Sequence, residues 1–200
     1  MKTFFRMKNW TLVLLCVSLL GSGRVSANTF SEEVEQLLQQ KLRLIEAMVA
    51  NPVLVALVKK SNRDNQGLSL GQILKIDKAW QTVLGIDDFI AGFISNECAD
   101  LLKVFQSAYV GFVEIFVSDA RGLIVGETNK TSDYYQADED WWVKAFNQGR
   151  GKSYYGDIEY DASAHAEAIA LYVPVLDPET QQVIGVVKAV YDFNAIIMEL

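Results

Sequence analysis

The chain has little of what zinc centres and disulfide frameworks are built from. Its 200 residues include one histidine and two cysteines. Of the two thiols, only Cys98 lies beyond the N-terminal segment described below, so it has no partner for an internal disulfide. One histidine and one thiol cannot supply the four ligands of a structural zinc site. We therefore expect neither kind of cross-link, and we expect Cys98 to be a small buried apolar residue.

Positive charge is also scarce. The chain has 18 lysines and arginines against 25 acidic residues, a formal net charge of -7. Four of the basic residues precede the first acidic residue, Glu32, so residues 28–200 carry 14 basic against 25 acidic side chains, or -11. Such a surface repels nucleic-acid phosphates and anionic lipid headgroups, whereas neutral or cationic ligands are easier to accommodate.

The first residues have the pattern of an export signal. A basic start is followed by the apolar run Thr11 to Leu20 and by the small residues Val25-Ser26-Ala27. We predict that residues 1–27 are a signal peptide cleaved after Ala27 and that the mature protein is periplasmic. The apolar run is shorter than the ~20 residues that span a bilayer, although an uncleaved signal anchor is the alternative.

The first half of the remaining chain is patterned for helices. Apolar residues recur at spacings of three and four along a long helix that begins after Ser31, its expected N-cap. Asn51-Pro52 should end this helix, because the residue before proline is pushed out of the helical region. A shorter helix is expected over 53–60 and a polar loop over 61–67. Glycines interrupt the helical spacing over 70–105, which favours several short helices there.

The second half is patterned for strands. Two apolar runs, 111–117 and 123–127, are joined by turn residues and predict a hairpin. A polar loop over 129–140 and a short helix over 141–148 follow. Three further strand-like runs lie at 152–160, 167–175 and 183–191. We therefore predict an α+β fold, in which a five-stranded antiparallel sheet has its helices segregated to one side or end.

A series of short pieces in the second half carries a family resemblance. Together with the long helix after Ser31, the series resembles the extracytoplasmic Cache-type, PAS-like (PDC) sensor domains of chemoreceptors and sensor kinases. The resemblance implies one domain over 28–200, with a helical part over 28–110 and a PAS-like sheet module over 111–200. The pieces are Phe116 to Gly122, Asp140-Trp141-Trp142, Tyr154 to Asp157, and Val183 to Val190.

The same resemblance implies a pocket on one face of the sheet, closed by residues 129–148, for amino acids, amines, carboxylates or similar metabolites. Many members that bind amino acids grip the ligand carboxylate with an arginine two residues before the first aromatic of the Trp-Trp pair. Glu139 stands at that position here, so Arg150 or Lys152 would have to take over the role. Asp157 matches the aspartate that meets a ligand amine.

Aromatic side chains are the other candidates for ligand contacts. Trp141 and Trp142 are neighbours on the expected helix and point about 100° apart, so one should be in the core and one in the pocket wall. The face of a pocket tryptophan can hold a cation. Tyr134, Tyr135 and Tyr155 lie in or next to the proposed lid. They could orient a ligand or simply pack beneath the loop, and the sequence does not favour one interpretation over the other.

Asp157, Glu159 and Asp161 alternate along a predicted strand and should therefore share one of its faces. They could hold a calcium ion, but calcium sites normally add loop carbonyls and a glycine-bearing turn, so we favour a solvated acidic face. Ser163 near His165 has the composition of a hydrolase site without the glycine-bearing strand-to-helix turn. We predict no catalytic residues, no cofactor and no metal site.

We therefore expect an exported small-ligand-binding sensor domain that is not an enzyme. It would bind an amine, amino acid or similar metabolite and signal through a separate membrane protein. The apolar positions of the long helix cover more than the ~100° arc that one-sided packing requires, which favours a homodimer through this helix. The alternative is a periplasmic enzyme or accessory factor on the same scaffold, since a fold does not fix a function; Asp138 and Asp140 would then be its candidate carboxylates.

Overall fold

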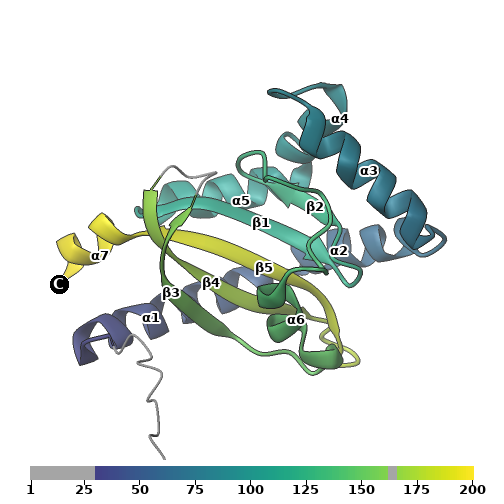
Figure 1. The fold of residues 1–200 in the computed structure, drawn as a ribbon. Helices are drawn as coiled ribbons and strands as arrows, with labels where there is room; N and C mark the ends of the chain where they lie inside the picture. The colour runs from purple at the N-terminus through teal and green to yellow at the C-terminus, as the bar shows by residue number, and fades with distance from the viewer. Residues whose placement is uncertain (1–29, 162–165) are drawn as a thin grey trace, which may run out of the picture.

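The structure is a computed structural model and describes residues 30–161 and 166–200. The predicted signal peptide, its cleavage site after Ala27, and the pair Ser163 and His165 lie outside the described residues. Helices come first along the chain (Figure 1): α1 (Glu32–Val49), α2 (Pro52–Asn65), α3 (Leu70–Thr82), α4 (Asp88–Ile94) and α5 (Glu97–Ala108). The second half holds β1 (Phe112–Asp119), β2 (Ile124–Glu127), α6 (Asp140–Phe146), the one-turn 3-10 helix η1 (Asn147–Gly149), β3 (Tyr154–Asp161), β4 (Ala166–Leu176), β5 (Val183–Asp192) and α7 (Phe193–Glu199).

The five strands form one antiparallel sheet in the order β2-β1-β5-β4-β3. The predicted α+β class, the hairpin of β1 and β2, and the five-stranded antiparallel sheet are confirmed. Strand β5 lies at the centre, where Lys188 is paired with Phe116 of β1 on one side and Tyr172 of β4 on the other. Directly paired residues of an antiparallel sheet share a face, so these three side chains point the same way.

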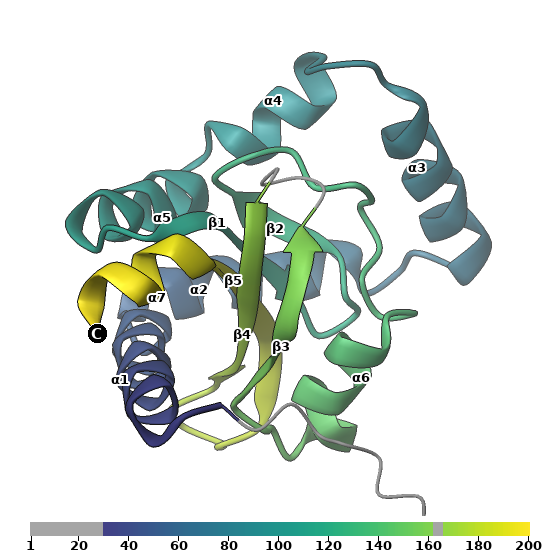
Figure 2. The ribbon, with the colours of Figure 1, turned by 60° about the vertical axis from the view of Figure 1, so that its left-hand side comes forward.

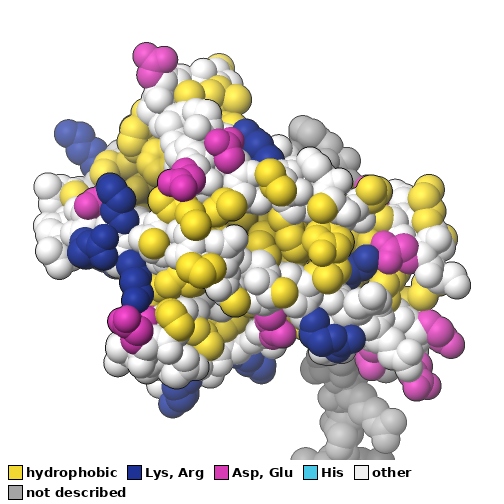
Figure 3. Space-filling model, turned by 180° about the vertical axis from the view of Figure 1, so that it is seen from behind, with side chains coloured by type: hydrophobic (Ala, Val, Ile, Leu, Met, Phe, Trp, Pro, Cys, Tyr) yellow, Lys and Arg dark blue, Asp and Glu magenta, His cyan; other side chains and the backbone are white. Residues whose placement is uncertain are grey.

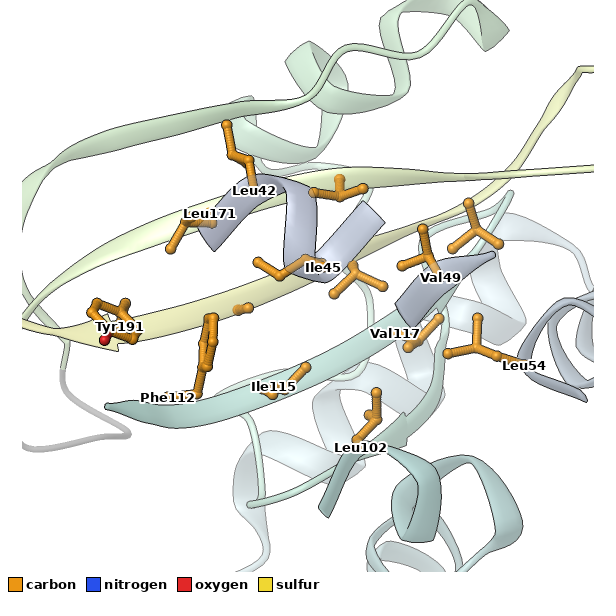
Figure 4. Close-up of a cluster of buried hydrophobic side chains, with 14 of the residues drawn as sticks. Leu42, Ile45, Val49, Leu54, Leu102, Phe112, Ile115, Val117, Leu171 and Tyr191 are labelled. Atoms are coloured by element: carbon orange, nitrogen blue, oxygen red, sulfur yellow. The ribbon is translucent and has the colours of Figure 1, made fainter. Parts of the chain in front are cut away.

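Helices α1, α2 and α5 cover the other face of the sheet (Figures 1 and 2). Leu42 and Ile45 of α1 pack there against Ile115, Val117 and Leu171 of the strands, and all five side chains are almost fully buried (Figure 4). Burying a side chain of this size stabilises the fold by about 1.5–3 kcal/mol. This apolar core fixes the sheet and leaves its opposite face available for a site.

A second cluster of buried side chains joins α3 and α4 to the β2 edge of the sheet. Trp80 of α3 is at its centre, and its indole Nε1 donates to the carbonyl of Thr131 at 2.9 Å. Asp77, one turn earlier, accepts from the backbone N–H groups of Tyr134 and Tyr135 at 2.8 and 3.0 Å. These contacts tie the segment after β2 to α3.

The long helix begins and ends as its sequence predicts. The Ser31 hydroxyl accepts from the N–H of Val34, and α1 stops at Val49, just before Asn51-Pro52. Asn51 in turn caps α2, and its side chain accepts from the N–H of Val53 at 2.8 Å. No described helix is both long enough and apolar enough to cross a membrane.

The predicted loop over 61–67 is wrong for its first five residues, because α2 continues to Asn65. Ser61 and Asn65 donate to the Asp119 carboxylate at 3.0 and 2.8 Å. The Asn62 side chain binds the N–H of Ala120 and a carbonyl of β5. The polar residues that predict a loop in the sequence thus form one face of α2, and this face packs on the turn between β1 and β2. Helix α7 was not expected from the sequence either.

Candidate ligand-binding site

The face of the sheet turned away from α1 carries polar and aromatic side chains. Helix α6 lies against this side (Figures 1 and 2). A small cavity of about 80 Å³ opens on this face over β3, β4 and β5. It is lined by Gly156, Asp157, Glu159, Tyr160, Asp161, Ala168, Ala170, Tyr172, Lys188 and Val190.

The two tryptophans of α6 point in different directions, as their spacing on a helix predicts. Trp142 is buried, and its indole Nε1 donates to the Ser118 hydroxyl at 2.9 Å. Trp141 is half-buried and stacks on Tyr172, with ring centroids 5.1 Å apart and planes at 17°. The Tyr154 hydroxyl donates to the Trp141 carbonyl at 2.9 Å. Trp142 is therefore a core residue, whereas Trp141 stands over an aromatic residue of the cavity.

Lys188 is a largely buried cation on this face, and it was not predicted from the sequence. Its Nζ lies 3.6 Å from an Asp161 carboxylate oxygen, and the two side chains are only 19% and 15% exposed. The same Nζ is 5.8 Å from the centre of the Phe116 ring and 5.9 Å from that of Trp141. A cation within about 6 Å of an aromatic face is attracted to it. The central strand thus places a positive charge between aromatic walls and a carboxylate.

The predicted acidic strand provides the other charges. A β-bulge lies between Tyr155 and Ile158, and such bulges re-aim the side chains around them. Asp157 is exposed at the edge of the cavity, and Glu159 and Asp161 line it as well. Among the residues that the structure describes, no cluster of three or more carboxylate, histidine or cysteine side chains could hold a metal ion.

Neither the residue at the position of the family's arginine nor its two suggested substitutes supplies a cation to the cavity. Arg150 and Lys152 are exposed and do not line the cavity. Glu139 caps the start of α6 without a side-chain hydrogen bond. Partial burial, together with the negative charges of Asp133 and Asp138, raises the pKa of Glu139. The cation that lines the cavity therefore comes from β5, while Lys144 of α6 lies nearby, with its Nζ 3.9 Å from the centre of the Tyr154 ring.

Three predicted ligand contacts lie elsewhere. Tyr155 points to the α1 side of the sheet, where its ring meets Phe30 at 6.0 Å between centroids. Tyr134 is buried in the α3–α4 cluster, and Tyr135 is half-buried against the same cluster. Of the six residues predicted for ligand binding, the structure thus places Asp157 at the cavity and Trp141 beside it.

No protein-family model and no curated protein sequence matches the chain. Solved structures are similar to it in fold. The ligand-binding domain of the Pseudomonas fluorescens chemoreceptor CtaA, in complex with L-valine, is 16% identical with a TM-score of 0.47, and the match covers 84% of this chain and 58% of that one. The sensor domain of the V. cholerae histidine kinase DctB is 12% identical with a TM-score of 0.44, covering 84% and 54%. The ligand-binding domain of the Campylobacter jejuni chemoreceptor Tlp3, in complex with 4-methylisoleucine, is 13% identical with a TM-score of 0.41, covering 83% and 62%.

The chain therefore spans between about half and two thirds of the length of these three structures. These three solved structures, to which the chain is similar in fold, are sensor domains of chemoreceptors and of a histidine kinase, and they are Cache-type domains.

Proposed function

We propose that this protein is a small-ligand sensor domain that takes up an amino acid, or another metabolite with an amine, between the sheet and α6. The observation that carries the proposal is Lys188, a largely buried cation in the middle of a sheet face, bordered by Phe116, Trp141 and Asp161. Charged side chains are rarely placed in the centre of a sheet unless they are paired or serve a site.

The charges on this face suit a ligand that has both signs. Lys188 would meet a ligand carboxylate, and the exposed Asp157 together with Glu159 would meet its amine. Charge-assisted hydrogen bonds of this kind are shorter and stronger than neutral ones. A ligand with only a cationic group fits less well, because Lys188 already neutralises Asp161.

The cavity is small for a whole ligand. Its volume of about 80 Å³ falls below the ~300 Å³ at which ligand pockets usually begin. Uptake of an amino acid would therefore displace Trp141 from its stack on Tyr172 and shift α6 away from the sheet. Such a displacement would convert occupancy into a change of shape, which is what a sensor needs.

Location and signalling belong to the same proposal. The N-terminal pattern of residues 1–27 supports export to the periplasm, and we propose that a separate membrane protein reads the ligand state. The alternative is an enzyme or accessory factor on the same scaffold, and an assay for turnover distinguishes the two. A compound that raises the melting temperature without being turned over would support the sensor, whereas product formation would support the enzyme.

The test begins with a thermal-shift screen of the purified protein against amino acids and biogenic amines. We then expect Asp157→Ala to lower the affinity for the best ligand by about tens- to hundreds-fold, because the ligand amine loses its charged partner. Calorimetry measures this change. Glu167→Ala is the matched control, since Glu167 is an exposed acidic residue of the neighbouring strand and does not line the cavity. Unchanged affinity in a folded Asp157→Ala variant would show that Asp157 does not contact the ligand amine. Unchanged affinity in Lys188→Met as well would move the site off the sheet face.

A further inference from the structure

A second and larger cavity, of about 380 Å³, lies among α2, the α4–α5 junction and β2. It shares no lining residue with the cavity on the sheet face. Its volume falls within the range of small-molecule pockets. Apolar residues from four different segments form much of its wall, namely Leu57, Phe93, Ile124, Val125 and Tyr134.

Tyr134 gives this cavity a polar group that the fold leaves unused. The residue is only 5% exposed, and its ring is held between Trp80 and Phe93, with centroids 5.5 and 5.4 Å away. Its backbone N–H is bound to Asp77, but no described residue forms a hydrogen bond with its hydroxyl. Since Tyr134 lines the cavity and its hydroxyl has no partner among the described residues, this hydroxyl is available to a bound molecule.

The charges around the cavity select against an anion. Asp119 is fully buried and holds Ser61 and Asn65, both of which line the cavity. Its negative charge, added to burial, raises the pKa of Tyr134 to about 12, so the hydroxyl stays protonated. An anionic group beside Tyr134 would be repelled by the same charge.

The remaining polar groups leave no free cation or nucleophile inside. Lys60 is at the exposed mouth and is paired with Asp64 at 2.5 Å. Cys98 also lines the cavity, and burial raises the pKa of its thiol to about 12, so it contributes an unreactive, weakly polar wall. Ser61, Asn65 and Asn96 use their side chains in hydrogen bonds within the protein, and Glu97 is exposed. The interior therefore offers apolar surface and the Tyr134 hydroxyl.

From this geometry we infer a second binding site, beside α2 and β2, for a small neutral molecule with an apolar body and one oxygen acceptor, such as an alcohol or a ketone. The oxygen accepts from the Tyr134 hydroxyl, and the apolar body fills the space between Leu57 and Ile124. Binding there bridges α2, α4 and β2, and it does not depend on whether the sheet face binds an amino acid.

The inference is tested with three probes that share one chain and differ in head group: 1-hexanol, hexanoate and hexylammonium. Amide chemical shifts of the ¹⁵N-labelled protein report where each probe binds. We expect saturable shifts with 1-hexanol at Cys98, Val125 and the end of α2, with much weaker binding of hexanoate. Larger chemical-shift changes with hexylammonium than with 1-hexanol would overturn the proposed ligand class. Shifts confined to Trp141 and Lys188 would overturn the proposed location of the site.

Variants separate the site from general effects of the alcohol. Tyr134→Phe keeps the ring and should weaken 1-hexanol binding by about threefold to tenfold, the effect of one neutral hydrogen bond. Leu57→Trp fills the cavity and should abolish the shifts, whereas Lys188→Met on the sheet face should leave them unchanged. Equal affinity in the wild type, Tyr134→Phe and Leu57→Trp would overturn the site even if the sheet face were proven to bind a ligand.

Discussion

At the scale of single residues, Glu127 is a buried carboxyl group at the edge of the sheet. Its side chain is fully buried on β2, opposite Phe116 in the register. One oxygen accepts from the N–H of Thr131 at 3.1 Å, while the other has no hydrogen-bond partner among the described residues. Burial above all, with a smaller contribution from the charge of Glu114, raises the pKa of Glu127 to about 7.

This raised pKa predicts how stability depends on pH. The folded protein binds a proton at Glu127 up to about pH 7, whereas the unfolded chain releases it near pH 4.5. Glu127 therefore makes the free energy of unfolding fall as the pH rises between these values, by up to about 3 kcal/mol. The glutamine in Glu127→Gln cannot ionise. We therefore expect the free energy of unfolding of this variant to rise relative to that of the wild type between pH 5 and pH 8, as measured by urea unfolding.

The control for this experiment is Glu35→Gln, because Glu35 is an exposed residue of α1. It should unfold with the pH dependence of the wild type. If Glu127→Gln did the same, the carboxyl group would be ionised in the folded protein throughout this range.

At the scale of elements, α2 is held to the sheet by its polar face. Asn62 accepts from the N–H of Ala120 at 2.9 Å and donates to the carbonyl of Ile184 at 2.7 Å. It thereby connects α2 to the turn after β1 and to the start of β5. The Arg121 guanidinium strengthens the same junction by donating to the carbonyls of Asn65 and Leu68.

Asn62→Ala should therefore destabilise the fold by about 2 kcal/mol, because a backbone donor and a backbone acceptor both lose their partner. Arg63→Ala is the neighbouring control; this exposed side chain should change the free energy of unfolding by about 0.5 kcal/mol or less. Chemical denaturation measures both. An equal effect of the two substitutions would mean that water replaces Asn62 at little cost.

At the scale of the whole molecule, the outer side of the helical layer has an apolar surface. A groove of about 370 Å³ runs between α1 and α5. Figure 3 shows hydrophobic side chains gathered on this side of the protein. Val104 and Val110, in and just after α5, are 70% and 84% exposed. The predicted homodimer would therefore use α5 as well as α1.

We expect the protein to dimerise at high micromolar concentration and Val104→Glu to make it monomeric, because a charge would be buried in the apolar interface. Leu84→Glu is the control, since Leu84 is fully exposed in the α3–α4 connection, away from this groove. Sedimentation equilibrium distinguishes the two states. A wild-type monomer at that concentration, or loss of the dimer in both variants, would contradict this arrangement.

The sequence by itself determined the features that depend on near neighbours along the chain. The cap at Ser31, the end of α1 before Pro52, the hairpin of β1 and β2 and the divergence of Trp141 from Trp142 all follow from local geometry. Periodicity and turn chemistry act over a few residues, so they can be read without knowing the fold. The same local evidence placed Asp157 on a strand, where the structure also has it.

The tertiary structure alone decided which residues meet across the sheet. Lys188 is the one charged residue in the otherwise apolar run from Val183 to Tyr191, a signal that could have identified it, but its approach to Asp161 depends on β4 lying between β5 and β3. The register of β3 with β4 places Tyr155 on the α1 side of the sheet. The packing of α3 against the segment after β2 places Tyr134 at the second cavity. Strand register and helix docking are set by the burial of apolar surface over the whole domain, and no local pattern contains that sum.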